Sequence, residues 1–180
     1  MCKHFLVAFA SRFGSTADVA DVIGMVLEQS GAFADVRPVS EITRLDRYDG
    51  VILGSAIRSG KWLPEAIQFL EAHRSILARI PVAYFTLCLT LRKDTADNRR
   101  TVFSYHAPLV RDFPEVRPVS IGMFAGMIDF ADLPPATRRM ARRTSIPEGD
   151  FRDWSQIRDW ALSVKPLLAD ASKARSSAYS

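Results

Sequence analysis

Short apolar runs alternate with amphipathic segments along this chain, and this alternation limits the fold more than any other feature of the sequence. The runs are rich in β-branched or aromatic residues, as buried strands are. Between the first two runs, Val19, Ile23, Val26 and Leu27 recur at helical spacing before Gly31 ends the segment. The alternation predicts an α/β domain whose parallel sheet is covered on both faces. The predicted strands are residues 5–10, 35–39, 51–55, 82–87 and 116–121.

The helices that should cover this sheet are predicted over residues 17–29, from Pro64 onward, within 95–113 and from Asp153 onward. Gln156 follows Asp153 by three residues, which is an Asp-type variant of the capping box. Pro166 is expected to kink or end the last helix. The chain is therefore interpreted as one domain over residues 1–168 with a flexible tail over 169–180, and residues 123–150 form its least regular part.

The loop after the first strand, Ser11-Arg12-Phe13-Gly14-Ser15-Thr16, is built from small and hydroxylated residues and leads into a helix. Free amides and the positive end of the helix dipole at such a junction favour an anionic group, above all a phosphate. Ser11, Ser15 and Thr16 add hydroxyl donors, and Gly14 permits close approach of the backbone. The same pattern also occurs as a plain helix cap.

Other common motifs are missing from the sequence. It has no G-x-G-x-x-G, no G-K-[ST] and no G-x-S-x-G, so a dinucleotide fold, a P-loop NTPase and a serine hydrolase are unsupported. The three histidines show no metal-ligand spacing, so no metal is predicted. Ala10 and Ser11 stand where a response-regulator receiver domain needs carboxylates, which disfavours that function.

Composition describes an ordinary globular chain of 180 residues, 48% hydrophobic and 24% charged. No apolar run is long enough to span a membrane, and no signal-peptide pattern precedes the first strand. Cys2 and Cys88 are too few for a disulfide framework. A cytoplasmic protein is therefore expected. The formal net charge of +4 favours anionic partners or an anionic surface, and no nucleic-acid partner is predicted.

The loop at residues 11–16 resembles the FMN-phosphate loop of flavodoxin-like proteins, [ST]-x-T-G-x-T, with Phe13 in place of the middle Thr. It is also similar to the [ST]-R-x-G-x-T loop of the menaquinone-dependent protoporphyrinogen dehydrogenases. In the same order, residues 55–61 (SAIRSGK) resemble that family's S-I-R-x-G-H, residues 91–94 (LRKD) its A-R-K-P, and residues 153–157 (DWSQI) its D-W-E-Q-V. The family's aromatic and basic segment before the last helix is only loosely echoed by residues 123–143.

Five strands with this spacing fit the flavodoxin-like order 2-1-3-4-5, a three-layer sandwich that binds ligands at the carboxyl ends of its strands. The loops after the first, third and fourth strands should converge there around FMN. The predicted cofactor-binding residues are Ser11, Arg12, Phe13, Gly14, Ser15, Thr16, Ser55, Ala56, Ile57, Arg58, Gly60, Trp62, Thr86, Leu87, Cys88 and Leu89.

Three of these residues also have purely structural interpretations. Arg12 either contacts the FMN phosphate or is an exposed loop arginine. Trp62 either covers one face of the flavin ring or packs as a staple at the start of the next helix, and the staple is slightly favoured. Cys88 is expected to pack beside the flavin without redox chemistry.

A basic rim around the flavin is predicted to bind the substrate. An anionic substrate such as a porphyrinogen with propionates, or an anionic membrane surface, would be attracted to it. Charge runs of this kind are more often simply solvated. The residues of this rim are Lys61, Arg92, Lys93, Arg138, Arg139, Arg142 and Arg143, and Arg58, Arg99 and Arg100 are expected to add positive charge beside them.

The resemblance implies an FMN oxidoreductase that passes reducing equivalents from an organic substrate to a quinone, with the flavin carrying the chemistry. No catalytic side chain is predicted. One alternative is a flavodoxin-type electron carrier, against which the sequence pI of about 9.3 argues, since such carriers are usually acidic. Another is an FMN-dependent quinone or NAD(P)H reductase with a different substrate. A flavodoxin-like fold that has lost its flavin, motivated by Phe13, is the last alternative.

Overall fold

A five-stranded parallel sheet forms the centre of the molecule, in the order β2-β1-β3-β5-β6. Among the principal strands this is the predicted order 2-1-3-4-5, which is confirmed. The computed structural model describes residues 2–143 and 148–177. The sheet consists of β1 (His4–Ala10), β2 (Phe33–Pro38), β3 (Gly50–Arg58), β5 (Val82–Cys88) and β6 (Pro118–Ala125), and β4 (Lys61–Trp62) pairs with the end of β3.

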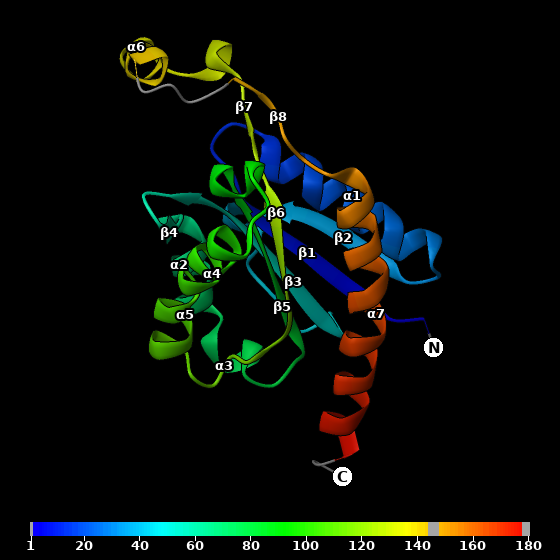
Figure 1. Ribbon diagram of the computed structural model, residues 1–180. Coiled ribbons are helices and arrows are strands. Elements are labelled where there is room, and N and C mark those ends of the chain that lie inside the picture. Colours follow the sequence, from blue (N-terminus) through cyan, green and yellow to red (C-terminus); the bar gives the residue numbers. More distant parts are fainter. Residues whose placement is uncertain (1, 144–147, 178–180) are drawn as a thin grey trace.

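Helices cover both faces of this sheet (Figure 1). One face carries α1 (Ser15–Gln29) and α7 (Trp154–Ser177), which pack against each other as well as on the strands. The other face carries the helices α2 (Pro64–Ala72), α3 (Arg74–Leu77), α4 (Ala96–Ser104) and α5 (Ala107–Asp112), together with the 3₁₀ turn η1 (Val39–Glu41). Among the described residues, no helix combines the length and apolar character needed to cross a bilayer.

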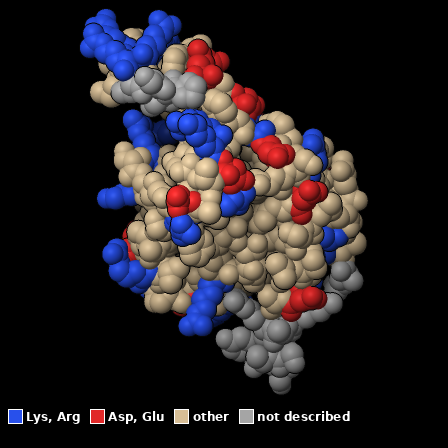
Figure 2. Space-filling view, in the orientation of Figure 1, with Lys and Arg blue, Asp and Glu red and all other residues tan. Residues whose placement is uncertain are grey.

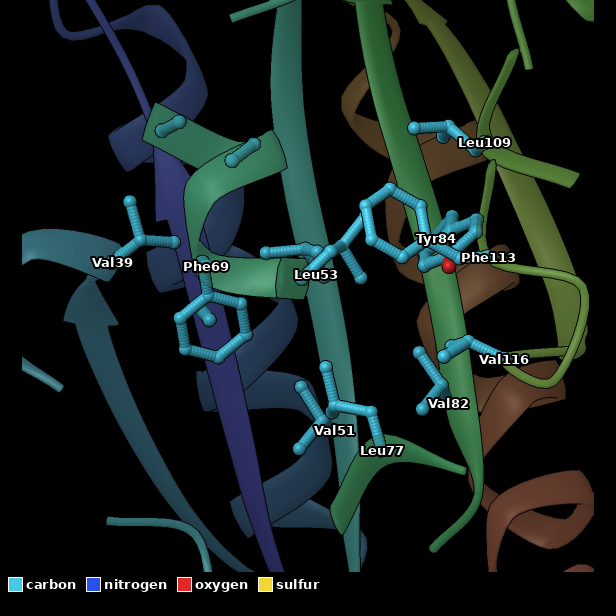
Figure 3. Packing of buried hydrophobic residues seen from close by; sticks show 14 of the residues in the cluster. Val39, Val51, Leu53, Phe69, Leu77, Val82, Tyr84, Leu109, Phe113 and Val116 are labelled. Atoms are coloured by element: carbon cyan, nitrogen blue, oxygen red, sulfur yellow. The ribbon is translucent and has the colours of Figure 1, made fainter. Parts of the chain in front are cut away.

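Strand alternation divides the core into two halves, because successive side chains of a strand point to opposite faces. In β3, Val51 and Leu53 belong to the cluster beneath the α2 side, whereas Ile52 belongs to the cluster beneath α1 and α7. Figure 3 shows the first cluster, in which Phe69 of α2 and Tyr84 of β5 pack around Leu53. Continuous apolar strands are therefore required here, since both faces are buried.

Helix ends follow the signals predicted from the sequence. Gly31 adopts a left-handed φ of 86° after α1, and the amide of Ala32 donates to the Leu27 carbonyl at 3.1 Å. At the start of α7, the Gln156 amide donates to Asp153 Oδ1 at 3.0 Å, so the Asp153 half of the predicted capping box is confirmed.

The larger differences from the predicted elements occur at four places. The third strand continues to Arg58, so the expected loop at 55–62 is the end of a strand and a hairpin. The fifth strand continues past Gly122 to Ala125. The single helix expected within 95–113 is two helices, α4 and α5, and α7 continues past Pro166 to Ser177. The division of the chain at residue 168 stays a prediction.

Beyond the sheet, the irregular segment after β6 folds into a small separate layer. Its elements are β7 (Met127–Ile128), which pairs antiparallel with β8 (Gly149–Asp150), the 3₁₀ turn η3 (Phe130–Asp132) and α6 (Pro135–Arg143). Figure 1 shows α6 at the top of the molecule, past the carboxyl ends of the strands. Phe130, Leu133 and Ala141 form the small apolar cluster that holds this layer together.

Candidate flavin site

The loop between β1 and α1 is a compact turn that ends at Gly14. Gly14 has a φ of 86°, a conformation that glycine adopts at little cost, and its carbonyl accepts the Asp18 amide at 3.1 Å. Its own amide donates to Ser11 Oγ at 3.1 Å, so Ser11 braces the loop. The amides at the first turn of α1 follow directly, where the helix dipole favours an anion.

Thr16 supports the interpretation of this turn as an anion site. Its side chain is fully buried, yet its Oγ1 has no hydrogen-bond partner among the described residues. An unsatisfied buried hydroxyl costs about 1–3 kcal/mol. The first turn of α1 therefore combines amides with an unpartnered hydroxyl, a donor set that fits a phosphate group.

Arg12 does not stand free beside this turn. Its Nη2 lies 3.3 Å from Glu65 Oε1 at the start of α2, and the two side chains are 47% and 45% exposed. A pair this exposed contributes little stability, about 0–1 kcal/mol. Arg12 thus has a structural partner, although its side chain also lines the cavity described next.

A cavity opens at the carboxyl ends of β1, β3 and β5, as predicted for a sheet of this order. Its walls are largely aliphatic and come from the three predicted loops and from the segment after β6. Predicted residues that line it are Ser11, Arg12, Phe13, Ser15, Ala56, Ile57, Arg58, Leu87 and Leu89. Predicted residues that do not are Gly14, Thr16, Ser55, Gly60, Trp62, Thr86 and Cys88, together with all seven residues of the basic rim.

The hairpin after β3 explains part of this sorting. Arg58 pairs with Lys61 across the two-residue turn Ser59-Gly60, whose φ angles of 51° and 74° are both positive, as a type I′ turn requires. Ser55, beneath the hairpin, is fully buried and accepts the Leu63 amide on its Oγ at 3.0 Å. The hairpin keeps Ile57 and Arg58 at the cavity and Gly60 and Lys61 outside it.

Trp62 is a core residue and does not cover the cavity. It is 5% exposed, and its Nε1 donates to Thr86 Oγ1 at 3.1 Å. Thr86 Oγ1 lies 3.0 Å from Nε2 of His106, whose Nδ1 lies 3.2 Å from the Phe103 carbonyl. Burial lowers the pKa of His106, so the ring is neutral; Nδ1–H donates to the carbonyl and Nε2 accepts the Thr86 hydroxyl. This buried chain supports the structural interpretation of Trp62.

Cys88 is buried among Leu91, Val102 and Ala125, with its Sγ 3.3 Å from Thr90 Oγ1. This is the packing role that the sequence favoured. Its neighbours Leu87 and Leu89 are the residues of β5 and the following turn that reach the cavity.

None of the residues of the basic rim lines the cavity. Arg92 donates to the Leu89 carbonyl at 3.2 Å, Lys93 is exposed, and the arginines of α6 line a separate depression on the outer side of that helix. The charged residues that line the cavity are Arg12 and Arg58, opposed by Asp129 and Asp132. The lining is therefore mixed in charge, and a role of the basic rim in substrate binding stays a prediction.

The sequence interpretation missed the wall formed by residues 126–137. Gly126, Met127, Ile128, Leu133 and Thr137 line the cavity from the layer beyond β6. The apolar run Met123-Phe124-Ala125 after Gly122 was the available signal, since it continues the fifth strand.

Arg152 fastens this wall to α1. Its side chain is only 6% exposed and bonds Asp150 through two nitrogens, Nε at 2.8 Å and Nη2 at 2.7 Å. Nη1 donates to Asp18 Oδ2 of α1 at 2.8 Å, and Nη2 lies 3.4 Å from the Met127 Sδ. The hydrogen bonds from Arg152 hold the pKa of Asp150 below its usual value.

Sheet order, the phosphate-type turn and a cavity at the carboxyl edge together define a flavodoxin-like protein. A family model described as "Flavodoxin domain" matches residues 6–154, and the chain belongs to this family. The solution structure of two-electron reduced Megasphaera elsdenii flavodoxin superimposes with a TM-score of 0.55 at 11% identity, over 88% of this chain and 98% of that one.

Curated relatives point to a narrower group. The chain is 27% identical over 173 residues to protoporphyrinogen IX dehydrogenase [quinone] of Escherichia coli K12, covering 90% of this chain and 94% of that protein. It is 26% identical to the protein of the same name from Leishmania major, covering 90% of this chain and 74% of that protein. The chain is thus a flavodoxin-family protein distantly related to these dehydrogenases.

Proposed function

We propose that this protein is an FMN-dependent oxidoreductase that passes reducing equivalents from an organic substrate to a quinone. The observation that carries the proposal is the first turn of α1, where the hydroxyl of buried Thr16 has no partner among the described residues and the preceding residue, Ser15, lines a largely aliphatic cavity. A porphyrinogen as substrate and a quinone as acceptor are supported by the two relatives from Escherichia coli and Leishmania major, each a protoporphyrinogen IX dehydrogenase [quinone].

The residues of this chain would bind and orient the cofactor. Ser15 and Thr16 offer first-turn amides and hydroxyls to the phosphate. Ile57, Leu87 and Leu89 line the cavity with apolar surface that excludes water from a flat ring. Bound FMN would supply the two-electron chemistry that no side chain can provide.

Cofactor selectivity tests the first half of the proposal. The purified protein is reconstituted with FMN, FAD and riboflavin, and binding is followed by flavin fluorescence. We expect a clear preference for FMN, because the turn accommodates one terminal phosphate. Equal affinity for riboflavin would remove the phosphate-site assignment.

Acceptor chemistry tests the second half. The FMN-loaded protein is reduced anaerobically and mixed with a soluble quinone analogue in a stopped-flow instrument. Rapid, complete reoxidation supports an oxidoreductase. Slow reoxidation by the quinone, together with rapid single-electron exchange with a redox protein, would identify an electron carrier instead.

A further inference from the structure

The two sides of helix α6 differ: one side lines the cavity, and the opposite side carries positive charge. Thr137 contributes to the cavity wall, whereas Arg139, Arg142 and Arg143 are exposed and line the outer depression. At 100° per residue these three arginines lie on the side of the helix opposite Thr137. We call Arg139, Arg142 and Arg143 the basic face.

Arg138 belongs to the structure of the layer rather than to this face. Its Nη2 donates to the carbonyl oxygens of Ala131 at 2.9 Å and Leu133 at 3.1 Å. These bonds tie α6 to η3 and fix the direction in which the helix projects. The basic face on the same helix is therefore held facing away from the rest of the layer.

Among the described residues, the basic face has no neutralising carboxylate, whereas several other arginines have one. Arg44 pairs with Asp46, Arg99 with Asp94 and Arg111 with Asp112. No carboxylate lies within ion-pair distance of the basic face in residues 2–143 and 148–177. Uncompensated positive charge that projects from the body attracts a negatively charged surface.

The shape of the basic face favours a flat surface, rather than a nucleic acid, as its binding partner. Figure 2 shows Lys and Arg side chains gathered over α6 at one extremity of the molecule. A helix of nine residues spans only about 13 Å, too short to follow a nucleic-acid backbone for many phosphates. The three arginines share one side of the helix, so a flat surface on that side can contact all of them at once.

We infer that the basic face docks the protein on a bilayer that contains anionic lipids. Thr137 on the opposite side of the same helix lines the cavity. Docking would therefore hold the cavity about one helix diameter from the bilayer, in which an apolar quinone dissolves. Binding requires no flavin chemistry, and it can succeed or fail independently of the proposed function.

Vesicle binding tests this inference. The full chain loaded with FMN is centrifuged with vesicles of phosphatidylcholine, alone or mixed with phosphatidylglycerol. We expect binding to the mixed vesicles only, weakening as salt is added. Each arginine near an anionic surface contributes roughly fivefold in binding, so the triple variant R139Q/R142Q/R143Q should bind roughly 100-fold more weakly.

A charge-matched control separates the basic face from net charge. The variant R44Q/R100Q/R111Q removes three exposed arginines elsewhere, so both variants lower the formal net charge from +4 by 3, to +1. Circular dichroism and flavin content confirm that each variant folds. Retained binding by the control supports the inference. Equal losses in both variants, no binding by the parent, or equally tight binding of duplex DNA by the parent would overturn it.

Discussion

Two residues at the start of α1 carry the cofactor hypothesis. Gly14 occupies the left-handed region that other residues avoid, so only glycine fits this turn without strain. Thr16 buries a hydroxyl with no partner among the described residues, a state that is unfavourable without a ligand.

Replacing Gly14 with Val should weaken FMN binding at least tenfold and lower the free energy of unfolding by about 1–2 kcal/mol, because a β-branched residue is strained at a φ of 86°. Flavin titration and chemical denaturation measure the two effects. Gly31→Val is the matched control, since Gly31 has the same φ at the other end of α1 and open space around it. It should lose stability but keep its FMN affinity; a parallel loss of affinity would contradict the site.

Thr16→Val should change stability and binding in opposite directions. Removing the unpartnered hydroxyl should raise the free energy of unfolding of the flavin-free protein by about 1 kcal/mol. FMN affinity should fall roughly tenfold, the effect of one lost hydrogen bond to a charged group. Riboflavin affinity, in contrast, should not change. Unaltered FMN affinity in this variant would show that the hydroxyl has no part in phosphate binding.

At the scale of elements, the buried chain Trp62–Thr86–His106 ties β4, β5 and the α4–α5 junction together beneath the cavity. Arg152 does the same for β8 and α1 on the other side. The walls of the cavity are thus held by hydrogen bonds between elements that are far apart in sequence.

This arrangement predicts a pH dependence of stability. Burial lowers the folded-state pKa of His106 below its unfolded value of about 6.5, so the unfolded chain binds the proton more readily. The contribution of neutral His106 to the free energy of unfolding is complete above about pH 6.5 and is lost as the pH falls through the folded-state pKa. Chemical denaturation of the parent and of His106→Gln is measured between pH 8 and pH 5. The free energy of unfolding should fall more steeply with decreasing pH in the parent than in the variant. Parallel curves would show that His106 is not held neutral.

At the scale of the whole molecule, charge is divided between two regions with separate roles. The cavity contains Arg12 and Arg58 against Asp129 and Asp132, whereas the uncompensated arginines project from α6. Under the proposed function, we therefore expect recognition of an anionic substrate to depend on the cavity cations, with Arg58 the stronger candidate because Arg12 pairs with Glu65.

Arg58→Gln should raise the KM for an anionic porphyrinogen several-fold and reduce the dependence of kcat/KM on ionic strength. The triple variant of the basic face should leave the KM within about twofold in detergent-free buffer without vesicles. Steady-state kinetics over a salt series provides the measurement. An increase in KM in the triple variant alone would show that the arginines of α6, and not Arg58, recognise the substrate.

The order of elements, the covering of both faces and the turn at residues 11–16 that leads into α1 follow from the sequence by itself, because they depend on local patterns. Val19, Ile23, Val26 and Leu27 are buried along one side of α1, as their spacing requires. Gly31 and Asp153 mark helix ends through hydrogen bonds that reach only a few residues.

The identity of the cavity-lining residues was decided only by the tertiary structure. Continuation of β3 into a hairpin sends Trp62 into the core while Ile57 faces the cavity, and strand pairing far along the chain sets that direction. Residues 126–137 become a wall because β6 extends to Ala125 and Arg152 anchors the layer beyond it. The α6 arginines turn away because Arg138 binds the carbonyls of the preceding turn. Each of these directions depends on contacts between segments that are far apart in sequence, and the local periodicity of the sequence does not report such contacts.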